Sequence, residues 1–139
     1  MEKSVADAIG EAGLFSLCTR KELKLVAKLA KTRTVREGTT LLTEGETGDT
    51  MFVVLSGGAT VHKGGRKIAD IGPGEVVGEL AVLARAPRNA TVKTTADSEV
   101  ATIGRRELFR LIDDAPGFSR KLFESLANRV RDLDKKLVC

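Results

Sequence analysis

Glycines separate nearly every pair of short β-like segments in the middle of this chain. Seven segments of three to five residues are rich in β-branched or alternating apolar residues, at 34–36, 40–43, 51–55, 59–62, 67–71, 90–94 and 99–103. The glycines between them are Gly38, Gly45, Gly48, Gly57, Gly58, Gly64, Gly65, Gly72 and Gly74. Short strands joined by tight glycine turns favour a small closed roll over an open sheet.

Helical patterns flank this predicted roll, which spans residues 33–104. Residues 1–32 predict a short helix over 4–10 and a second one to about Lys31, opened by Thr19 as N-cap with Glu22 three residues later. Residues 105–139 predict one helix over 105–113 and another from Phe118 towards Val138, with a break at 115–117. At 139 residues the chain is large enough for one domain, mostly β with flanking helices.

Positive charge is concentrated in residues 20–36, where seven basic side chains accompany a single acid, Glu22. Such a run occurs in nucleic-acid surfaces. Leu23, Val26 and Leu29 nevertheless mark an apolar stripe opposite the lysines, and no nucleic-acid recognition motif accompanies the charge. We therefore interpret the run as the solvated face of an amphipathic helix and expect no nucleic-acid partner.

Several absences from the sequence limit its chemistry. His62 is the only histidine, which argues against a histidine metal site or a Ser-His-Asp triad. Cys18 and Cys139 lie far apart without a C-x-x-C partner, so we expect free thiols and a cytoplasmic protein. No apolar run approaches membrane-spanning length, and we expect no membrane partner.

Residues 77–92, V-G-E-L-A-V-L-A-R-A-P-R-N-A-T-V, combine the parts of an anion site with a hydroxyl acceptor. A strand, a glycine turn and a helix start present several free backbone N–H groups at one point. Arg88 adds a planar cation suited to a phosphate. Glu79 supplies an acceptor for hydroxyls. A small site that takes both an anion and a diol fits a sugar phosphate, and a nucleotide in particular.

The same stretch resembles the phosphate-binding cassette of the cyclic-nucleotide-binding domain family, found in the cyclic AMP receptor protein, protein kinase A regulatory subunits and ion channels. The residues that match the family pattern at the right spacing are Gly78, Glu79, Leu80, Ala81, Leu83, Pro87, Arg88, Ala90 and Thr91. Val77 stands where an aromatic residue is usual, and Asn89 where Ala, Thr or Ser is usual. A G-x-x-G-D turn at residues 45–49 extends the resemblance, which covers about residues 14–126.

The resemblance implies an eight-stranded antiparallel β-roll of the jelly-roll type, with a short phosphate-binding helix. It assigns Glu79 to the ribose 2′-hydroxyl and Arg88 to an exocyclic phosphate oxygen. The N–H groups of Leu80, Ala81 and Ala90 complete the cradle, and Gly78 allows close backbone approach. The ligand is expected to desolvate both charges, so that loss of Arg88 weakens binding by about 3 kcal/mol or more. Before ligand arrives the two charges are expected to lie at the surface, so that the fold does not need Arg88.

The nucleotide base is expected against apolar positions of the roll, Val61 and Val77 among them. In the family a hydroxyl residue directly after the arginine often accompanies preference for cGMP. Asn89 is not such a residue, and we favour cAMP. A cap over the base is expected from the last helix, where the candidates are Arg129, Leu133 and Asp134.

The leading hypothesis is a non-catalytic sensor without a cofactor, in which cyclic nucleotide repositions the C-terminal helices about residues 113–117. Leu83 is expected to be the apolar residue whose contact with the moving helix changes. A separate effector protein is one possible receiver of the signal. We expect no DNA-binding or catalytic domain in this sequence. The alternatives are a cupin-like β-roll enzyme acting on a sugar phosphate and a protein-interaction module without a ligand.

The last predicted helix carries an apolar seam, Leu122, Leu126, Val130, Leu133 and Leu137. Its spacing suits either the same helix of a second chain or a lid over the nucleotide. Fewer than three heptads make a short coiled coil, and isolated helices of this size are marginal. We therefore predict a monomer or a weak homodimer through this helix.

Overall fold

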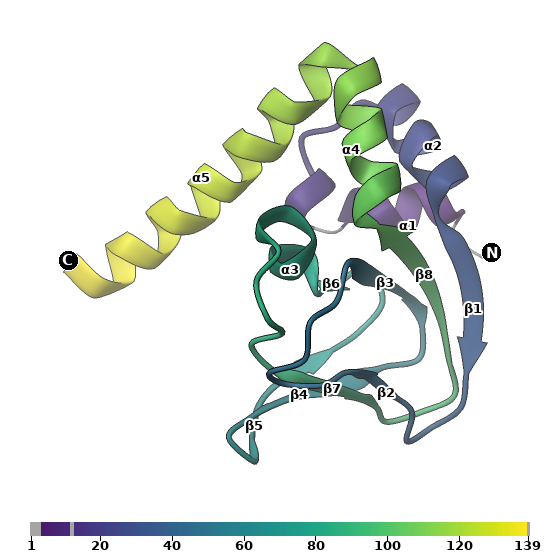
Figure 1. Ribbon diagram of the computed structural model, residues 1–139, viewed down its shortest axis with the longest axis vertical. Helices are drawn as coiled ribbons and strands as arrows, with labels where there is room; N and C mark the ends of the chain where they lie inside the picture. Colours follow the sequence, from purple (N-terminus) through teal and green to yellow (C-terminus); the bar gives the residue numbers. More distant parts are fainter. Residues whose placement is uncertain (1–3, 12, 139) are drawn as a thin grey trace.

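The computed structural model describes residues 4–11 and 13–138, together with their side chains except at residue 116 and residues 133–138. Eight strands form two four-stranded antiparallel sheets that face each other as a roll (Figure 1). The strands are β1 Lys31–Val35, β2 Thr40–Leu42, β3 Thr50–Ser56, β4 Ala59–Lys63, β5 Arg66–Ile71, β6 Val76–Val77, β7 Thr91–Thr94 and β8 Ser98–Gly104. The predicted eight-stranded antiparallel roll is thus confirmed.

The order of the strands is β1-β8-β3-β6 in one sheet and β2-β7-β4-β5 in the other. Seven of them correspond to the segments predicted from the sequence. The eighth, β6, is a two-residue strand in which Val77 lies opposite Phe52 of β3. It is too short to produce an alternating pattern, and it leads directly into the segment at 78–92.

The helical elements are α1 Val5–Glu11, the 3₁₀ turn η1 Gly13–Phe15, α2 Arg20–Leu29, α3 Glu79–Ala84, α4 Arg105–Asp114 and α5 Pro116–Val138. Helices α1, α2 and α4 lie at one end of the roll (Figure 1). The capping box predicted at Thr19 and Glu22 is present. Two predicted helix boundaries shift by two residues. Helix α2 ends at Leu29, because Lys31 already belongs to β1 and pairs with Thr102 of β8. Helix α5 begins at Pro116, the first helical position, where a missing N–H costs nothing.

Strand β3 divides the interior into two cores. Met51 and Val53 pack with the helices in a cluster that includes Phe15 and Phe118, whereas Phe52 points into the roll. The alternation arises because successive side chains of a strand point to opposite faces. The helical end of the molecule is therefore fixed on the same strand that lines the inside of the roll.

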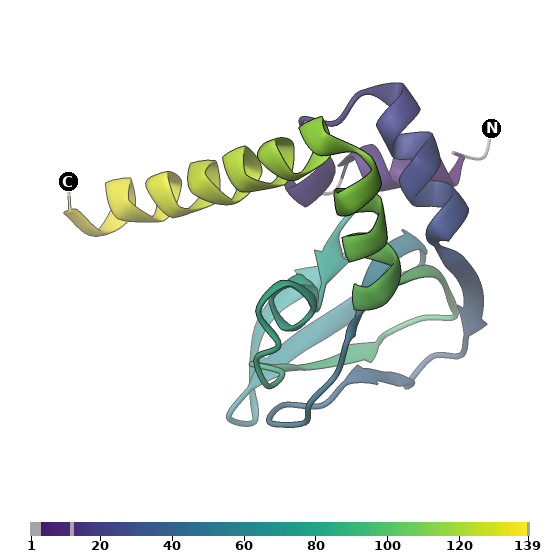
Figure 2. The same cartoon turned by 45° about the horizontal axis from the view of Figure 1, so that its top comes forward.

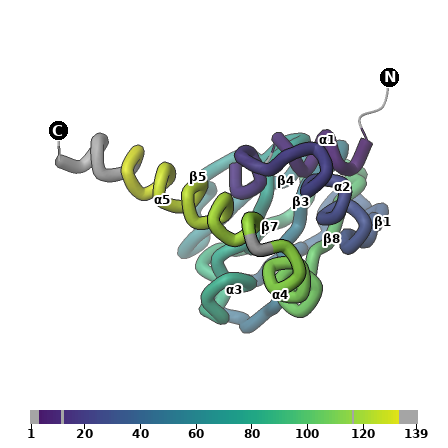
Figure 3. The backbone as a smooth tube through the Cα atoms, turned by 90° about the horizontal axis from the view of Figure 1, so that it is seen from above, coloured from purple at the N-terminus to yellow at the C-terminus, as the bar shows by residue number. Residues whose placement is uncertain are grey.

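Helix α5 leaves α4 at a sharp angle and projects beyond the rest of the molecule (Figures 2 and 3). Its first turns are packed, since Phe118 is fully buried and stacks on Phe15 at a centroid distance of 6.3 Å. Further along, Val130 is more than half exposed. Within the described residues, no helix has the length and apolar character needed to cross a bilayer.

Candidate functional site

A pocket of about 160 Å³ opens between the roll and α3. All nine residues predicted for the nucleotide site line it: Val61, Val77, Gly78, Glu79, Leu80, Ala81, Arg88, Asn89 and Ala90. They come from strands β4 and β6, helix α3 and the segment that precedes β7. The roll therefore brings together residues that are almost thirty positions apart in the chain.

Gly78 sets the start of α3 at the floor of this pocket. Its φ of +86° is in the left-handed region, which a side chain disfavours. A Cβ at this position would also lie 3.1 Å from the carbonyl oxygen of Thr50 and 2.8 Å from Nη1 of Arg88. Only glycine therefore fits at this position. The helix that begins after it presents its first N–H groups without acceptors in their own helix.

Arg88 is buried, with 9% of its surface exposed. Its Nη2 donates to the carbonyl oxygen of Thr50 at 2.7 Å, and its Nη1 to that of Gly78 at 3.3 Å. The expectation that Arg88 lies at the surface was therefore wrong, because its guanidinium links the start of α3 to β3. The expectation that the fold does not need Arg88 stays a prediction. Burial lowers the pKa of Arg88, and the nearby Asp49 carboxylate opposes that shift.

The turn at residues 45–49 holds Arg88 by its main chain and by its side chain. Gly45 donates to the carbonyl oxygen of Arg88 and Arg88 donates to that of Glu46, both at 2.8 Å. Gly48 lies against the guanidinium, so that a Cβ there would come within 2.5 Å of Nη2. Gly48 and Thr50 were missed as site residues. The G-x-x-G-D turn was the only signal in the sequence, and it did not show which side chain the turn contacts.

Glu79 is paired with the C-terminal helix. Its Oε1 accepts from Nη1 of Arg129 at 3.1 Å, and the Glu79 side chain is 14% exposed against 40% for Arg129. Among the described side chains, Glu79 forms no ion pair with Arg88. Arg129, one of the three predicted base-cap residues, thus reaches the edge of the site. The other two, Leu133 and Asp134, lie outside the side chains that the structure describes.

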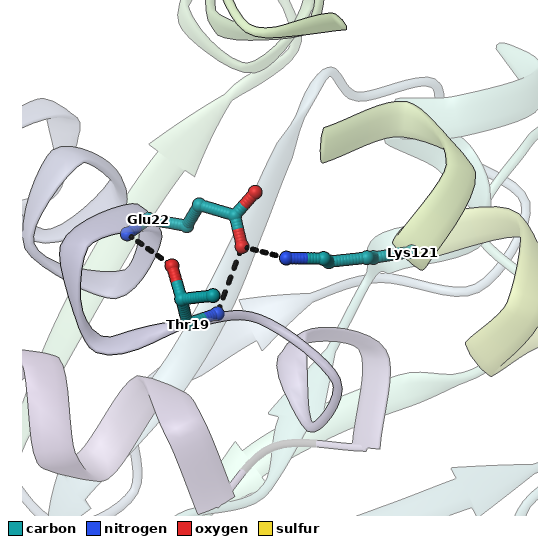
Figure 4. Close-up of polar contacts among 3 residues, drawn as sticks. All are labelled: Thr19, Glu22 and Lys121. Carbon is teal, nitrogen blue, oxygen red and sulfur yellow. Dashed lines mark hydrogen bonds and ion pairs between the residues drawn. The ribbon is translucent and has the colours of Figure 1, made fainter. Parts of the chain in front are cut away.

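A second ion pair fixes α5 closer to its beginning (Figure 4). Lys121 donates to Oε1 of Glu22 at 2.6 Å, and the same oxygen accepts from the main-chain N–H of Thr19 at 2.8 Å. Burial alone would raise the pKa of Glu22, but the hydrogen bonds from Lys121 and Thr19 outweigh it and leave that pKa below its usual value. Helix α5 is therefore anchored to α2 two turns before Arg129 meets the pocket.

The described residues contain no cluster of three or more His, Cys, Asp or Glu side chains able to hold a metal ion. The pocket instead combines a buried guanidinium, free helix N–H groups, a carboxylate and apolar walls. This set defines a binding site for a small organic anion that carries hydroxyl groups.

Comparison with known proteins identifies the family. The cyclic nucleotide-binding domain profile matches residues 32–115. The chain is 32% identical over 111 residues to a cAMP-dependent protein kinase regulatory subunit of Hypocrea atroviridis, a match that covers 80% of this chain and 24% of that protein. The chain belongs to the cyclic nucleotide-binding domain family.

Solved structures agree with this assignment. The N-terminal domain of a transcriptional regulator from Streptomyces coelicolor superposes with a TM-score of 0.82 at 27% identity, covering 93% of this chain and 96% of that one. The regulatory domain of Toxoplasma gondii protein kinase A, crystallised with cAMP, gives a TM-score of 0.74 at 29% identity, covering 94% and 52%. The chain spans about a quarter of the Hypocrea protein and about half of the Toxoplasma structure, so the output domains of such relatives are not assigned to it.

Proposed function

We propose that this domain is a non-catalytic sensor that binds cAMP in preference to cGMP and transmits binding through α5. The observation that carries the proposal is the placement of Arg88 and Glu79 in one pocket, a fixed cation for the ring phosphate and a carboxylate for the ribose. Both side chains are largely buried, and charged hydrogen bonds made there are stronger than in water.

Arg88 keeps donors available for a phosphate. A guanidinium has five N–H groups, and two of them are used on the carbonyl oxygens of Thr50 and Gly78. The remaining donors, with the N–H groups of Leu80, Ala81 and Ala90, would bind the exocyclic oxygens. Because Arg88 is already oriented by the protein, little side-chain entropy is lost when the phosphate arrives.

Glu79 connects the ribose to α5. Arg129 occupies Oε1 of Glu79, and a ribose 2′-hydroxyl would donate to the other carboxylate oxygen or displace the arginine. The pocket of about 160 Å³ is also smaller than the roughly 300–1,000 Å³ of typical ligand sites. A nucleotide must therefore widen it, and Arg129 is a contact through which this change would reach α5.

The preference for cAMP is argued from the base side of the pocket. Val61 and Val77 offer apolar surface to either purine. Asn89 is exposed and lacks the hydroxyl that often accompanies cGMP preference in the family. A relative of known structure, the Toxoplasma regulatory domain, was crystallised with cAMP.

Calorimetry with cAMP, cGMP, 2′-deoxy-cAMP and ribose 5-phosphate tests the proposal. We expect cAMP to bind most tightly and 2′-deoxy-cAMP far more weakly, and we expect Glu79→Ala to make the two nearly equal. Glu99→Ala, a change at an exposed carboxylate on β8, is the matched control and should keep the difference. Equal affinity for ribose 5-phosphate would favour a sugar-phosphate enzyme, and no binding of any of the four would favour an interaction module.

A further inference from the structure

A second concave surface lies beside α3 and shares no lining residue with the nucleotide pocket. It has a volume of about 700 Å³ and is lined by four arginines, one phenylalanine and three acids: Arg85, Arg105, Arg106, Arg110, Phe109, Asp49, Asp113 and Asp114. We call it the arginine hollow. Arg105 is held in place, because Nη1 donates to the carbonyl oxygen of Val82 and the guanidinium lies 4.3 Å from the Phe109 ring centroid. Among the described side chains, the other three arginines form no ion pair.

An apolar groove of about 250 Å³ adjoins the arginine hollow, since Phe109 lines both. Its walls come from α3, α4 and α5 and include Leu83, Ile112 and Phe123. The Phe123 side chain is 72% exposed, which is the largest exposed fraction among the large hydrophobic residues described. A basic surface and an apolar groove thus lie side by side, with Phe109 between them.

Most of the terminal charges of helix α4 stand in the order that its dipole disfavours. Arg105 and Arg106 occupy its first turn, together with one favourable acid, Glu107, and Asp113 and Asp114 occupy its last turn. Cations near a helix N-terminus and anions near a C-terminus each cost roughly 0.3–1 kcal/mol. Local rules that a sequence breaks without structural gain tend to mark functional surfaces.

Arg85 breaks a second local rule on the same face. It ends α3 in the left-handed region with φ 52°, and it is the only described residue other than glycine with a positive φ. Glycine or asparagine is the usual choice at such a helix end. The backbone of Arg85 is therefore strained, and its side chain lines the arginine hollow.

We propose that the arginine hollow and the apolar groove together dock an acidic, partly apolar segment of another protein. Carboxylates of the segment would pair with Arg85, Arg106 and Arg110, and an apolar side chain would enter the groove beside Phe123. Charge complementarity supports this occupant, since guanidinium forks bind carboxylates in pairs of hydrogen bonds. Asp49, Asp113 and Asp114 also line the hollow and would repel acids placed beside them, so the carboxylates of the segment should lie against the arginines.

Fluorescence anisotropy with the whole chain tests the docking surface. The probe is a fluorescein-labelled peptide in which a run of glutamates precedes Leu and Phe one helical turn apart, and the control peptide has lysines in place of the glutamates. We expect measurable binding of the acidic peptide only, weakened at least tenfold by Arg106→Glu with Arg110→Glu and at least threefold by Phe123→Ser. Urea unfolding checks that each variant remains folded.

Two matched changes on β5 serve as controls. Arg66→Glu alters the charge of an exposed arginine, and Ile68→Ser removes an apolar side chain that is 59% exposed. Both should leave peptide binding unchanged.

The proposal is overturned by the absence of peptide binding, by equal binding of the lysine peptide, or by equal effects of the β5 variants. It is also overturned if inorganic tripolyphosphate displaces the peptide while Phe123→Ser has no effect, because the hollow would then be a site for a small polyanion. Peptide-independent binding of the chain to phosphatidylserine vesicles, lost in the double arginine variant, would assign the surface to membranes instead.

Discussion

Replacing Gly48 by alanine tests how the site holds Arg88. The new Cβ would lie 2.5 Å from Nη2, 2.7 Å from Nε and 2.8 Å from Cζ of Arg88. Ordinary van der Waals contact begins at 3.4 Å, so the guanidinium must move by about 0.9 Å. Gly48 has no positive φ, and an alanine there adds no backbone strain of its own.

The displaced guanidinium loses its best hydrogen bond. Nη2 is 2.7 Å from the carbonyl oxygen of Thr50, and a shift of that size away from the oxygen leaves no hydrogen bond. A hydrogen bond to a charged group is worth about 1.5–3 kcal/mol. We therefore expect Gly48→Ala to destabilise the free domain by about 1–3 kcal/mol and to weaken cAMP binding roughly tenfold to a hundredfold, because each tenfold step corresponds to about 1.4 kcal/mol.

Urea unfolding and calorimetry with cAMP measure the two effects separately. Gly72→Ala is the matched control: this glycine also lies in a loop without a positive φ, and its Cβ would meet nothing closer than 3.9 Å. We expect the control to be close to wild type in both assays. If Gly48→Ala binds cAMP within threefold of wild type, Arg88 does not hold the phosphate from the position seen here.

Three further results follow from single contacts. Glu22 has a lowered pKa, so its contribution is present above the usual glutamate pKa and is lost as pH falls through the lower folded value. Lys121→Ala should therefore cost about 1–2 kcal/mol in urea unfolding at pH 7, and progressively less as the pH falls below the usual glutamate pKa of about 4.3. Burial raises the pKa of Cys18 to about 11, and in a Cys139→Ser protein its alkylation by iodoacetamide at pH 8 should be far slower than that of free cysteine and should accelerate with pH. Arg106→Glu should raise the free energy of unfolding by about 0.5–1 kcal/mol, because it places an anion at the start of α4; an unchanged or lower value would remove the argument that this helix opposes its dipole.

The sequence predicted the roll because its signals are local. Short strands and their glycine turns are encoded by neighbouring residues, and the capping box at Thr19 and Glu22 needs only three residues of separation. The pocket was predicted for a similar reason, since most of its lining lies within residues 77–92. Strand β6 was missed because two residues are too few to show a period.

Contacts between distant segments could not be predicted in the same way. Arg88 lies 38 residues from Thr50, whose carbonyl oxygen it bonds, and nothing near Arg88 in the sequence indicates that it is buried. Lys121 and Glu22 are 99 residues apart, and Arg129 and Glu79 are 50 apart. Each charge is ordinary at its own position, and only the direction that α5 takes after α4 brings the pairs together.

The energies of these contacts indicate where α5 can move. A swing of the whole helix at residues 113–117 would pull Phe118 from its fully buried stack on Phe15 and break the ion pair of Lys121 with Glu22. Losing the packing of a core phenylalanine costs about 3–5 kcal/mol. Arg129 is 40% exposed, and releasing a pair of that exposure costs at most about 1 kcal/mol.

The cheaper movement should occur first when a nucleotide reaches Glu79. We expect cAMP to change amide hydrogen exchange around Arg129 and to leave the protection of Phe118 and Leu122 unaltered, since the first turns of α5 stay packed on η1 and α2. Arg129→Gln should produce a similar change around residue 129 without ligand, because it removes the same ion pair. If cAMP instead lowers protection at residues 113–118, its binding energy exceeds the cost of undoing the Phe15–Phe118 stack, and the whole of α5 moves about that junction.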